Sequence, residues 1–151
     1  MTLVSYLMRS MYPGRTTGVI YGSCLTNSQT GYLVGILGRG ATLANEPTPF
    51  RPAFVSSNLL RTTDGGKTWT VVQTFNSGNF SQQISLRGVA CPRFGRLTVV
   101  GSLGGTQAVW TSTDNGATFG SPQLFSTNLL FAVSQSNTGL GLAVGMHVCL
   151  A

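Results

Sequence analysis

A pattern of eight residues occurs twice in this chain and restricts the folds that the chain can adopt. The first copy, Thr62 to Trp69, reads Thr-Thr-Asp-Gly-Gly-Lys-Thr-Trp, and the second, Ser112 to Phe119, reads Ser-Thr-Asp-Asn-Gly-Ala-Thr-Phe. The aspartate can accept hydrogen bonds from nearby backbone N–H groups, and the hydroxyl before it can do the same. The shared glycine permits the positive φ of a tight turn. We therefore predict two turns, each joining antiparallel strands, in which the acids are structural.

Each predicted turn has a hydroxyl, an aspartate, a glycine, a threonine and an aromatic residue that can fold over the turn. These residues are Thr62, Asp64, Gly66, Thr68 and Trp69 in the first copy and Ser112, Asp114, Gly116, Thr118 and Phe119 in the second. The pattern resembles the Asp-box, or BNR, repeat of sialidases, of photosystem II assembly-factor-like proteins and of other β-propellers. The second copy departs from that repeat by carrying Phe119 in place of Trp. The resemblance implies a hairpin between the third and fourth strands of a propeller blade, on its outer rim.

The composition favours an all-β fold. Charged residues make up only 8% of the chain, against ~25% in a typical soluble domain. Short hydrophobic runs alternate with clusters rich in Gly, Asn and Ser, which is typical of strands joined by turns. The formal net charge of +6 comes mostly from scattered arginines. This charge is consistent with solvated side chains or with an acidic partner surface.

The hydrophobic runs divide the chain into repeats within one domain of 1–151. An N-terminal segment, 1–15, precedes repeat one over 16–80, and repeat two covers 84–125. The two box aspartates lie 50 residues apart (114 − 64), which suits a blade-sized repeat of ~40–50 residues. The predicted strands are Gly18 to Cys24, Gly31 to Leu37, Phe54 to Arg61, Trp69 to Phe75, Leu86 to Cys91, Arg96 to Ser102, Gln107 to Thr111 and Phe119 to Leu124.

A third, partial repeat covers 128–151, where Val144-Gly145 repeats a strand ending also found at Val34-Gly35 and Val100-Gly101. The sequence thus predicts four-stranded antiparallel blades of propeller type, two complete and a third truncated. Closed propellers need more blades, and an open array leaves strand edges unpaired. We expect self-association or a protein partner at these edges, or a longer propeller of which this chain is a fragment. Met1 to Arg9 could alternatively add a strand to the last blade.

Repeat one carries an inserted loop, 38–53, that contains three prolines. Insertions on one face of a repeat protein are often binding sites. Within it, Phe50-Arg51-Pro52 resembles a degraded Phe-Arg-Ile-Pro motif of sialidases. Phe50 and Arg51 are therefore candidate binding residues, and a glycan-binding or sialidase-like module is an alternative function. Ordinary glycoside hydrolysis needs two positioned carboxyl groups, and Glu46 is the only acid outside the two boxes.

No catalytic residues, cofactor or metal site are predicted. His147 is the only histidine and lies in an apolar terminal run, which favours a half-buried or interface role. The cysteines show no C-x-x-C spacing. Cys24 and Cys91 stand at near-equivalent positions of two repeats, and we interpret them as small apolar residues of core strands. Cys149 remains free, reduced and buried, or available for an intermolecular bond.

Arginines and an aromatic residue gather at the start of repeat two. Arg87, Arg93, Phe94 and Arg96 are candidate binding residues for a protein partner, a phosphate, a carboxylate or a stacked base. Because no nucleic-acid fold motif accompanies them, association with nucleic acid ranks third among the functions. The first hypothesis is a non-catalytic scaffold for protein–protein interaction or assembly.

The N-terminus carries little targeting information. Met1 to Arg15 is weakly similar to a mitochondrial presequence, and because the chain starts at Met1 we expect this stretch to be retained. No secretory signal is visible, and no run approaches the ~20 apolar residues of a membrane span. The sequence therefore leaves the compartment open.

Overall fold

The computed structural model describes residues 18–37, 56–76, 83–92, 95–125, 128–138 and 140–147, and all regular elements within them are strands. None of these residues forms a helix long and apolar enough to cross a membrane. The stretch Met1 to Arg9, which could add a strand to the last blade, and the inserted loop 38–53 lie outside the described residues. The strands are β1 (Gly18–Leu25), β2 (Gly31–Leu37), β3 (Ser56–Thr62), β4 (Thr70–Phe75), β5 (Ile84–Ala90), β6 (Leu97–Leu103), β7 (Thr106–Ser112), β8 (Gln123–Phe125), β9 (Asn128–Gln135) and β10 (Gly141–His147).

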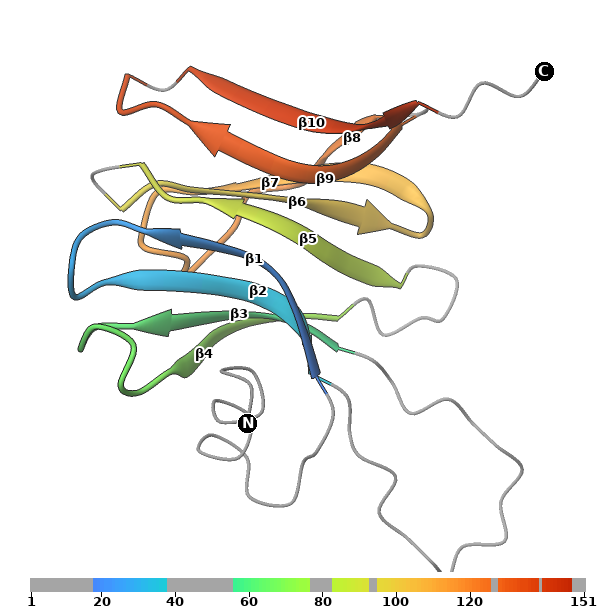
Figure 1. The fold of residues 1–151 in the computed structure, drawn as a ribbon. Coiled ribbons are helices and arrows are strands. Elements are labelled where there is room, and N and C mark those ends of the chain that lie inside the picture. The colour runs from blue at the N-terminus through green and yellow to red at the C-terminus, as the bar shows by residue number, and fades with distance from the viewer. Residues whose placement is uncertain are drawn as a thin grey trace, which may run out of the picture.

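These strands form three antiparallel sheets that follow the order of the chain. The first sheet has the order β1-β2-β3-β4, the second β5-β6-β7-β8, and the third contains β9 and β10. The prediction of an all-β fold with four-stranded antiparallel sheets is confirmed. Figure 1 shows the sheets stacked face to face, the first below and the third above. We call the face of each sheet that is turned toward the next sheet along the chain its upper face.

The first strand of each sheet contains a bulge at the same place in its register. One residue is skipped between Ile20 and Gly22 in β1, and one between Leu86 and Gly88 in β5. In β9 the skipped residue is Phe131. Because a bulge adds one residue against the partner strand, it shifts the alternation of faces and increases the local twist. The three sheets can therefore be aligned residue by residue from their bulges.

This alignment places one valine of each second strand opposite the residue that follows the bulge. Val34 pairs with Gly22, Val100 with Gly88, and Val144 with Ala132. The small residues at these bulges let the first strands approach each other. A Cβ added to Gly22 would lie 2.9 Å from the Cα of Gly88, and one added to Gly88 would lie 3.1 Å from the Cα of Ala132.

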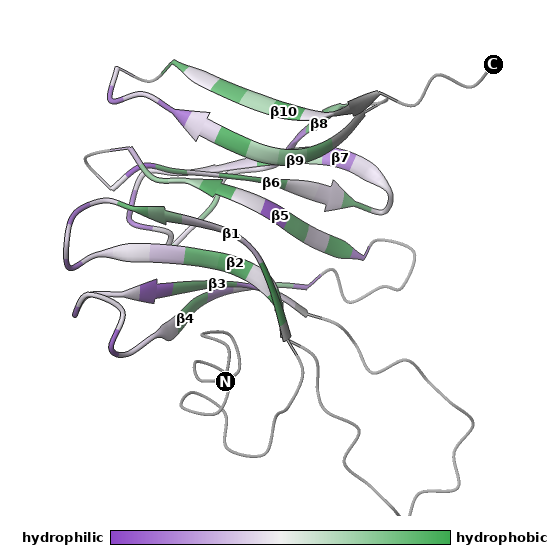
Figure 2. Ribbon diagram, viewed as in Figure 1, coloured by the Kyte–Doolittle hydropathy of each residue, from purple (hydrophilic) through white to green (hydrophobic). Residues whose placement is uncertain are grey.

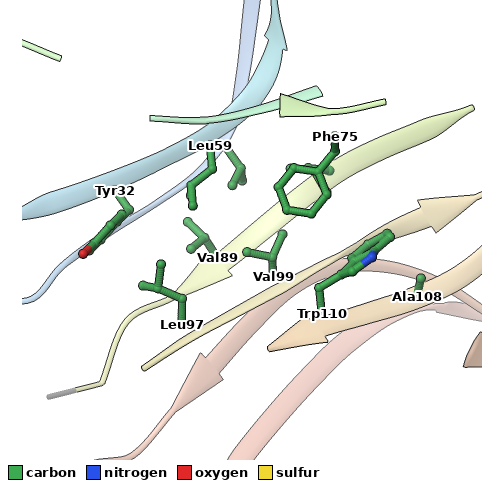
Figure 3. Packing of buried hydrophobic residues seen from close by; sticks show 10 residues of the cluster. Tyr32, Leu59, Phe75, Val89, Leu97, Val99, Ala108 and Trp110 are labelled. Carbon is green, nitrogen blue, oxygen red and sulfur yellow. The ribbon is translucent and has the colours of Figure 1, made fainter. Parts of the chain in front are cut away.

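The main core lies between the first two sheets (Figure 3). Alternate residues of a strand point to opposite faces, so the apolar residues on one face of each facing strand enter this core. Aromatic rings pack within it: Phe75 lies edge-on against Trp110 at 5.7 Å and against Phe119 at 5.1 Å between ring centroids. The other buried members are Tyr32, Val34, Leu59, Leu86, Val89, Leu97, Val99 and Ala108.

Hydrogen bonds tie each sheet to the next at matching positions. The Ser57 hydroxyl donates to the Ile84 carbonyl at 2.9 Å and accepts from the Leu86 N–H at 3.2 Å. One sheet higher, the Leu130 N–H donates to Gln107 Oε1 at 2.9 Å. Leu86 and Leu130 both directly precede a bulge. In both sheets, therefore, the N–H group at this position donates to a side chain of the sheet below.

A disulfide joins Cys24 to Cys91, and this corrects the interpretation of the two cysteines as repeated apolar core residues. In the observed register Cys24 pairs with Tyr32, and the corresponding position of the second sheet is Ala90 rather than Cys91. Cys91 therefore stands one residue further along, just after β5, where its side chain reaches β1. The bond closes a loop with a sequence separation of 67 and ties the first two sheets together.

The strand after the second turn is shorter than predicted. The sequence indicates a strand over Phe119 to Leu124, but β8 covers only Gln123–Phe125. Pro122 directly before it has no N–H to donate to a ladder. The Gly120 N–H instead donates to the Thr111 carbonyl at 3.1 Å.

Candidate functional site

The first turn is held by its own side chains. Oδ1 of Asp64 accepts hydrogen bonds from the Thr62 hydroxyl at 2.8 Å and from the Thr68 N–H at 2.9 Å. Oδ2 accepts from the Thr68 hydroxyl at 2.6 Å. The Thr62 hydroxyl also accepts from the Gly66 N–H at 2.9 Å, where φ is +89°. Both carboxylate oxygens thus serve to close the turn.

The second turn repeats these contacts. Asp114 accepts from the Ser112 hydroxyl at 2.7 Å, from the Thr118 N–H at 2.9 Å and from the Thr118 hydroxyl. The Gly116 N–H donates to the Ser112 hydroxyl at 2.9 Å. Each turn is also bonded to the loop between the first two strands of its sheet, since the Asn115 N–H donates to the Gly95 carbonyl at 2.8 Å and the Gly65 N–H donates to the Gln29 carbonyl at 2.9 Å. The two predicted turns therefore have the same internal hydrogen bonds.

These bonds set the protonation state of the two aspartates. Hydrogen bonds from the following threonine side chain, then from its N–H and from the preceding hydroxyl, lower the pKa of Asp64 and of Asp114 to about 2. A carboxylate stabilised in this way is ionised at neutral pH and is a poor proton donor or base. Because the third acid of the chain, Glu46, lies outside the described residues, the described part of the chain contains no acid other than these two.

The aromatic residues that end the two turns behave differently. The indole N–H of Trp69 donates to the Gly66 carbonyl at 3.1 Å, so this ring folds over its own turn. Phe119 has no such donor and packs against Phe75 of the first sheet instead. The second turn therefore packs against the first sheet. The fit is close, since a Cβ added to Gly116 would lie 2.7 Å from Leu59 Cδ2.

Of the predicted arginine patch, the structure describes Arg87 and Arg96. Arg93 and Phe94 lie outside the described residues, as do Phe50 and Arg51 of the inserted loop. Arg96 is exposed just before β6, whereas Arg87 is the bulge residue of β5, opposite Val100 and Gly101. At ~3.3 Å per residue along a strand, this offset separates their backbones by more than ~10 Å.

Arg87 instead contacts the bulge residue of the neighbouring sheet. Its guanidinium carbon lies 4.8 Å from the centre of the Tyr21 ring, which is close enough for a cation–π contact. Tyr21 is 39% exposed. This pair joins the first strands of the first and second sheets. It could not be predicted from the sequence, because composition and spacing do not show where the bulges lie.

The third sheet has an upper face that nothing in the described part of the chain covers. Val144 is 49% exposed, although its counterparts Val34 and Val100 are fully buried under the next sheet. Leu142 is 66% exposed, and Leu140 just before the strand is exposed as well. Figure 2 shows the apolar bands along β10. We call Leu140, Leu142 and Val144 the open face.

The outer half of the second sheet is also less covered than its counterpart. Phe125 pairs with Gln107, whose side chain reaches up to the third sheet, so Phe125 lies on the upper face as well. Its counterpart in the first sheet is Phe75, which pairs with Ser57 and is only 7% exposed. Phe125 is 48% exposed. Among the described strands, four cover the first sheet and two cover the second.

The described residues contain no group of three histidine, cysteine or acidic side chains that could hold a metal ion. The backbone of His147 belongs to β10, and Cys149 and Glu46 lie outside the described residues. Comparison with models of known protein families gives no match, and comparison with curated proteins gives none either. A proposal for the function therefore rests on the geometry of the molecule.

Proposed function

We propose that the protein is a non-catalytic scaffold for protein–protein assembly, built from propeller-type blades, and that its docking surface is the open face of the third sheet. The observation that carries this proposal is the contrast at one register position. Val34 and Val100 are buried beneath another sheet, and Val144 is half exposed. A contiguous exposed apolar surface of this kind is characteristic of an interface.

The remaining features agree with a structural rather than a chemical role. The two described carboxylates are ionised and occupied in separate turns. A glycosidase would need two carboxyl groups on either side of one bond. The outer edge of β10, which pairs with no other described strand, and its apolar side chains are instead the features that favour addition of another β-structure.

The energy available at the open face indicates a weak association. The exposed fractions of Leu140, Leu142 and Val144 amount to roughly two whole side chains per molecule. Covering them would contribute about 3 to 6 kcal/mol per copy, at about 1.5 to 3 kcal/mol for each fully buried side chain. Association itself costs ~4 kcal/mol or more. For purified protein, in which other copies are the only partners, we expect an affinity in the micromolar range or weaker.

Hydrogen exchange at a low and a high protein concentration tests this proposal. Assembly through the open face should slow exchange of the β10 amides as concentration rises, because bound copies exclude water from this strand. The amides of β1, whose Leu25 is also strongly exposed, are the internal control and should not change. Equal exchange of β10 at both concentrations would contradict the proposed docking surface.

A further inference from the structure

The outer edge of β10 is the place where a strand is missing by comparison with the other two sheets. β2 pairs with β1 on one side and β3 on the other, and β6 pairs with β5 and β7. β10 occupies the same position after its bulged strand, but among the described residues it pairs only with β9. Its outer backbone groups are therefore available to another strand.

The surface beside this edge is apolar, and no described strand covers it. Val109 and Phe125 lie on the upper face of the second sheet, below the position that a further strand would take. Their counterparts in the first sheet, Leu59 and Phe75, are buried at 0% and 7% exposure, whereas Val109 is half-buried and Phe125 is 48% exposed. We call the outer edge of β10 together with Val109 and Phe125 the step.

The first two sheets show what kind of residue covers such a surface. Phe75 is covered by Trp110 of β7 and by Phe119, with ring centroids at 5.7 Å and 5.1 Å. Trp110 pairs with Val99 of β6. The register position of Val99 corresponds to Ala143 in β10, so a residue opposite Ala143 would stand above Phe125 as Trp110 stands above Phe75.

The orientation of Ala143 supports this placement. Ala143 pairs with Val133 of β9, which lies two residues before Gln135. Gln135 Oε1 accepts a hydrogen bond from the Thr98 hydroxyl of the second sheet at 2.8 Å, so this face of the third sheet points down. A strand paired to β10 would therefore direct the residue opposite Ala143 toward the second sheet.

We propose that the step binds an extended segment of another polypeptide, which pairs antiparallel to β10 and places a large aromatic side chain opposite Ala143, against Phe125. This inference rests on the proposed scaffold function and specifies the partner. Backbone hydrogen bonds to the edge give affinity that is independent of sequence, and the aromatic residue gives selectivity. Val109 and Phe125 form the apolar floor that receives it.

A synthetic peptide with the sequence of β7, Thr-Gln-Ala-Val-Trp-Thr-Ser, is the probe for this site. It carries the strand that occupies the corresponding position in the second sheet. Labelled peptide is titrated with the full-length chain, and binding is read by fluorescence anisotropy. A second peptide with alanine in place of tryptophan should bind at least about tenfold more weakly, as expected for loss of a central aromatic anchor.

Two neighbouring residues of β8 provide matched protein variants. Phe125→Asp changes the floor of the step and should weaken binding of the tryptophan peptide by about tenfold or more. Leu124→Asp changes the next residue, which is 56% exposed and faces the opposite side of the sheet, and should leave binding unchanged. Since both side chains are about half exposed, neither change should prevent folding, which circular dichroism verifies.

The inference is overturned if the tryptophan peptide does not bind, or if both peptides, or both variants, bind equally. These failures are distinguishable from failure of the scaffold proposal. If β10 becomes protected with rising protein concentration but the peptide does not bind, the open face is an interface and the step is not a strand-binding site. If the peptide alone protects β10, the step is a site for a partner and copies of the chain do not associate.

Discussion

Gly116 and Gly66 occupy the same position in the two turns, yet their surroundings differ enough to give different costs for the same substitution. Both have positive φ, +83° for Gly116 and +89° for Gly66. A Cβ at Gly66 would meet only ring atoms of Trp69 at 3.8 Å, an ordinary contact. A Cβ at Gly116 would lie 2.7 Å from Leu59 Cδ2 and 2.8 Å from Leu97 Cδ1.

The expected losses of stability follow from these contacts. Placing alanine at a positive φ costs about 1 to 2 kcal/mol at either turn. At Gly116 the added methyl must also displace Leu59 and Leu97, which are 0% and 1% exposed and cannot move into solvent. Overpacking of this kind costs a further ~1 to 3 kcal/mol. We expect a total of about 2 to 5 kcal/mol for Gly116→Ala and about 1 to 2 kcal/mol for Gly66→Ala.

Urea unfolding of the wild type and the two variants measures this difference. At a slope of ~1 to 3 kcal/mol per molar urea, the midpoint of Gly116→Ala should fall clearly below that of Gly66→Ala. Equal midpoints for the two variants would refute the claim that the second turn packs against the first sheet. A lower midpoint for Gly66→Ala would mean that the first turn, and not the second, is the more tightly packed.

Three further outcomes are expected. The lowered pKa of Asp64 means that its contribution to stability is present above about pH 4 and is lost as pH falls toward about 2. As pH is lowered through this range, the urea midpoint of Asp64→Asn should fall less steeply than that of the wild type. Replacing Cys24 and Cys91 with serine should lower the free energy of unfolding by up to ~4 kcal/mol, because the crosslink spans a separation of 67 residues, and reduction of the wild type should reproduce the loss. Phe75→Ala should cost about 3 to 5 kcal/mol, whereas Phe125→Ala, at a half-exposed position, should cost far less in the same urea assay; similar costs would mean that the step is covered.

The local structure was readable from the sequence because it depends on residues close together in the chain. Asp64 and Thr68 are four residues apart, so the pattern alone indicated the turn and its glycine. The apolar runs between turns indicated the strands for the same reason. Turns of this kind can be predicted without knowing which sheets pack against each other.

The disulfide and the open face could not be predicted because they depend on register and on stacking. Cys91 lies one residue after Ala90, which occupies the register position of Cys24. This offset can be recognised only when the positions of the bulges are known. Val144 and Val100 belong to the same Val-Gly strand ending, and they differ in that no sheet of the described residues covers Val144. The offset between Arg87 and Arg96 along one hairpin also depends on the register of β5 and β6.

The molar mass in solution, measured by light scattering behind a sizing column over a series of concentrations, tests the central claim most directly. If the open face is a docking surface, the mass of the wild type should rise above the monomer value of 15.9 kDa as concentration increases. Leu142→Asp should remain a monomer, and Leu25→Asp, which changes an exposed residue of β1, should behave like the wild type. A wild type that stays monomeric at every concentration, or an assembly that Leu142→Asp does not weaken, would contradict the account.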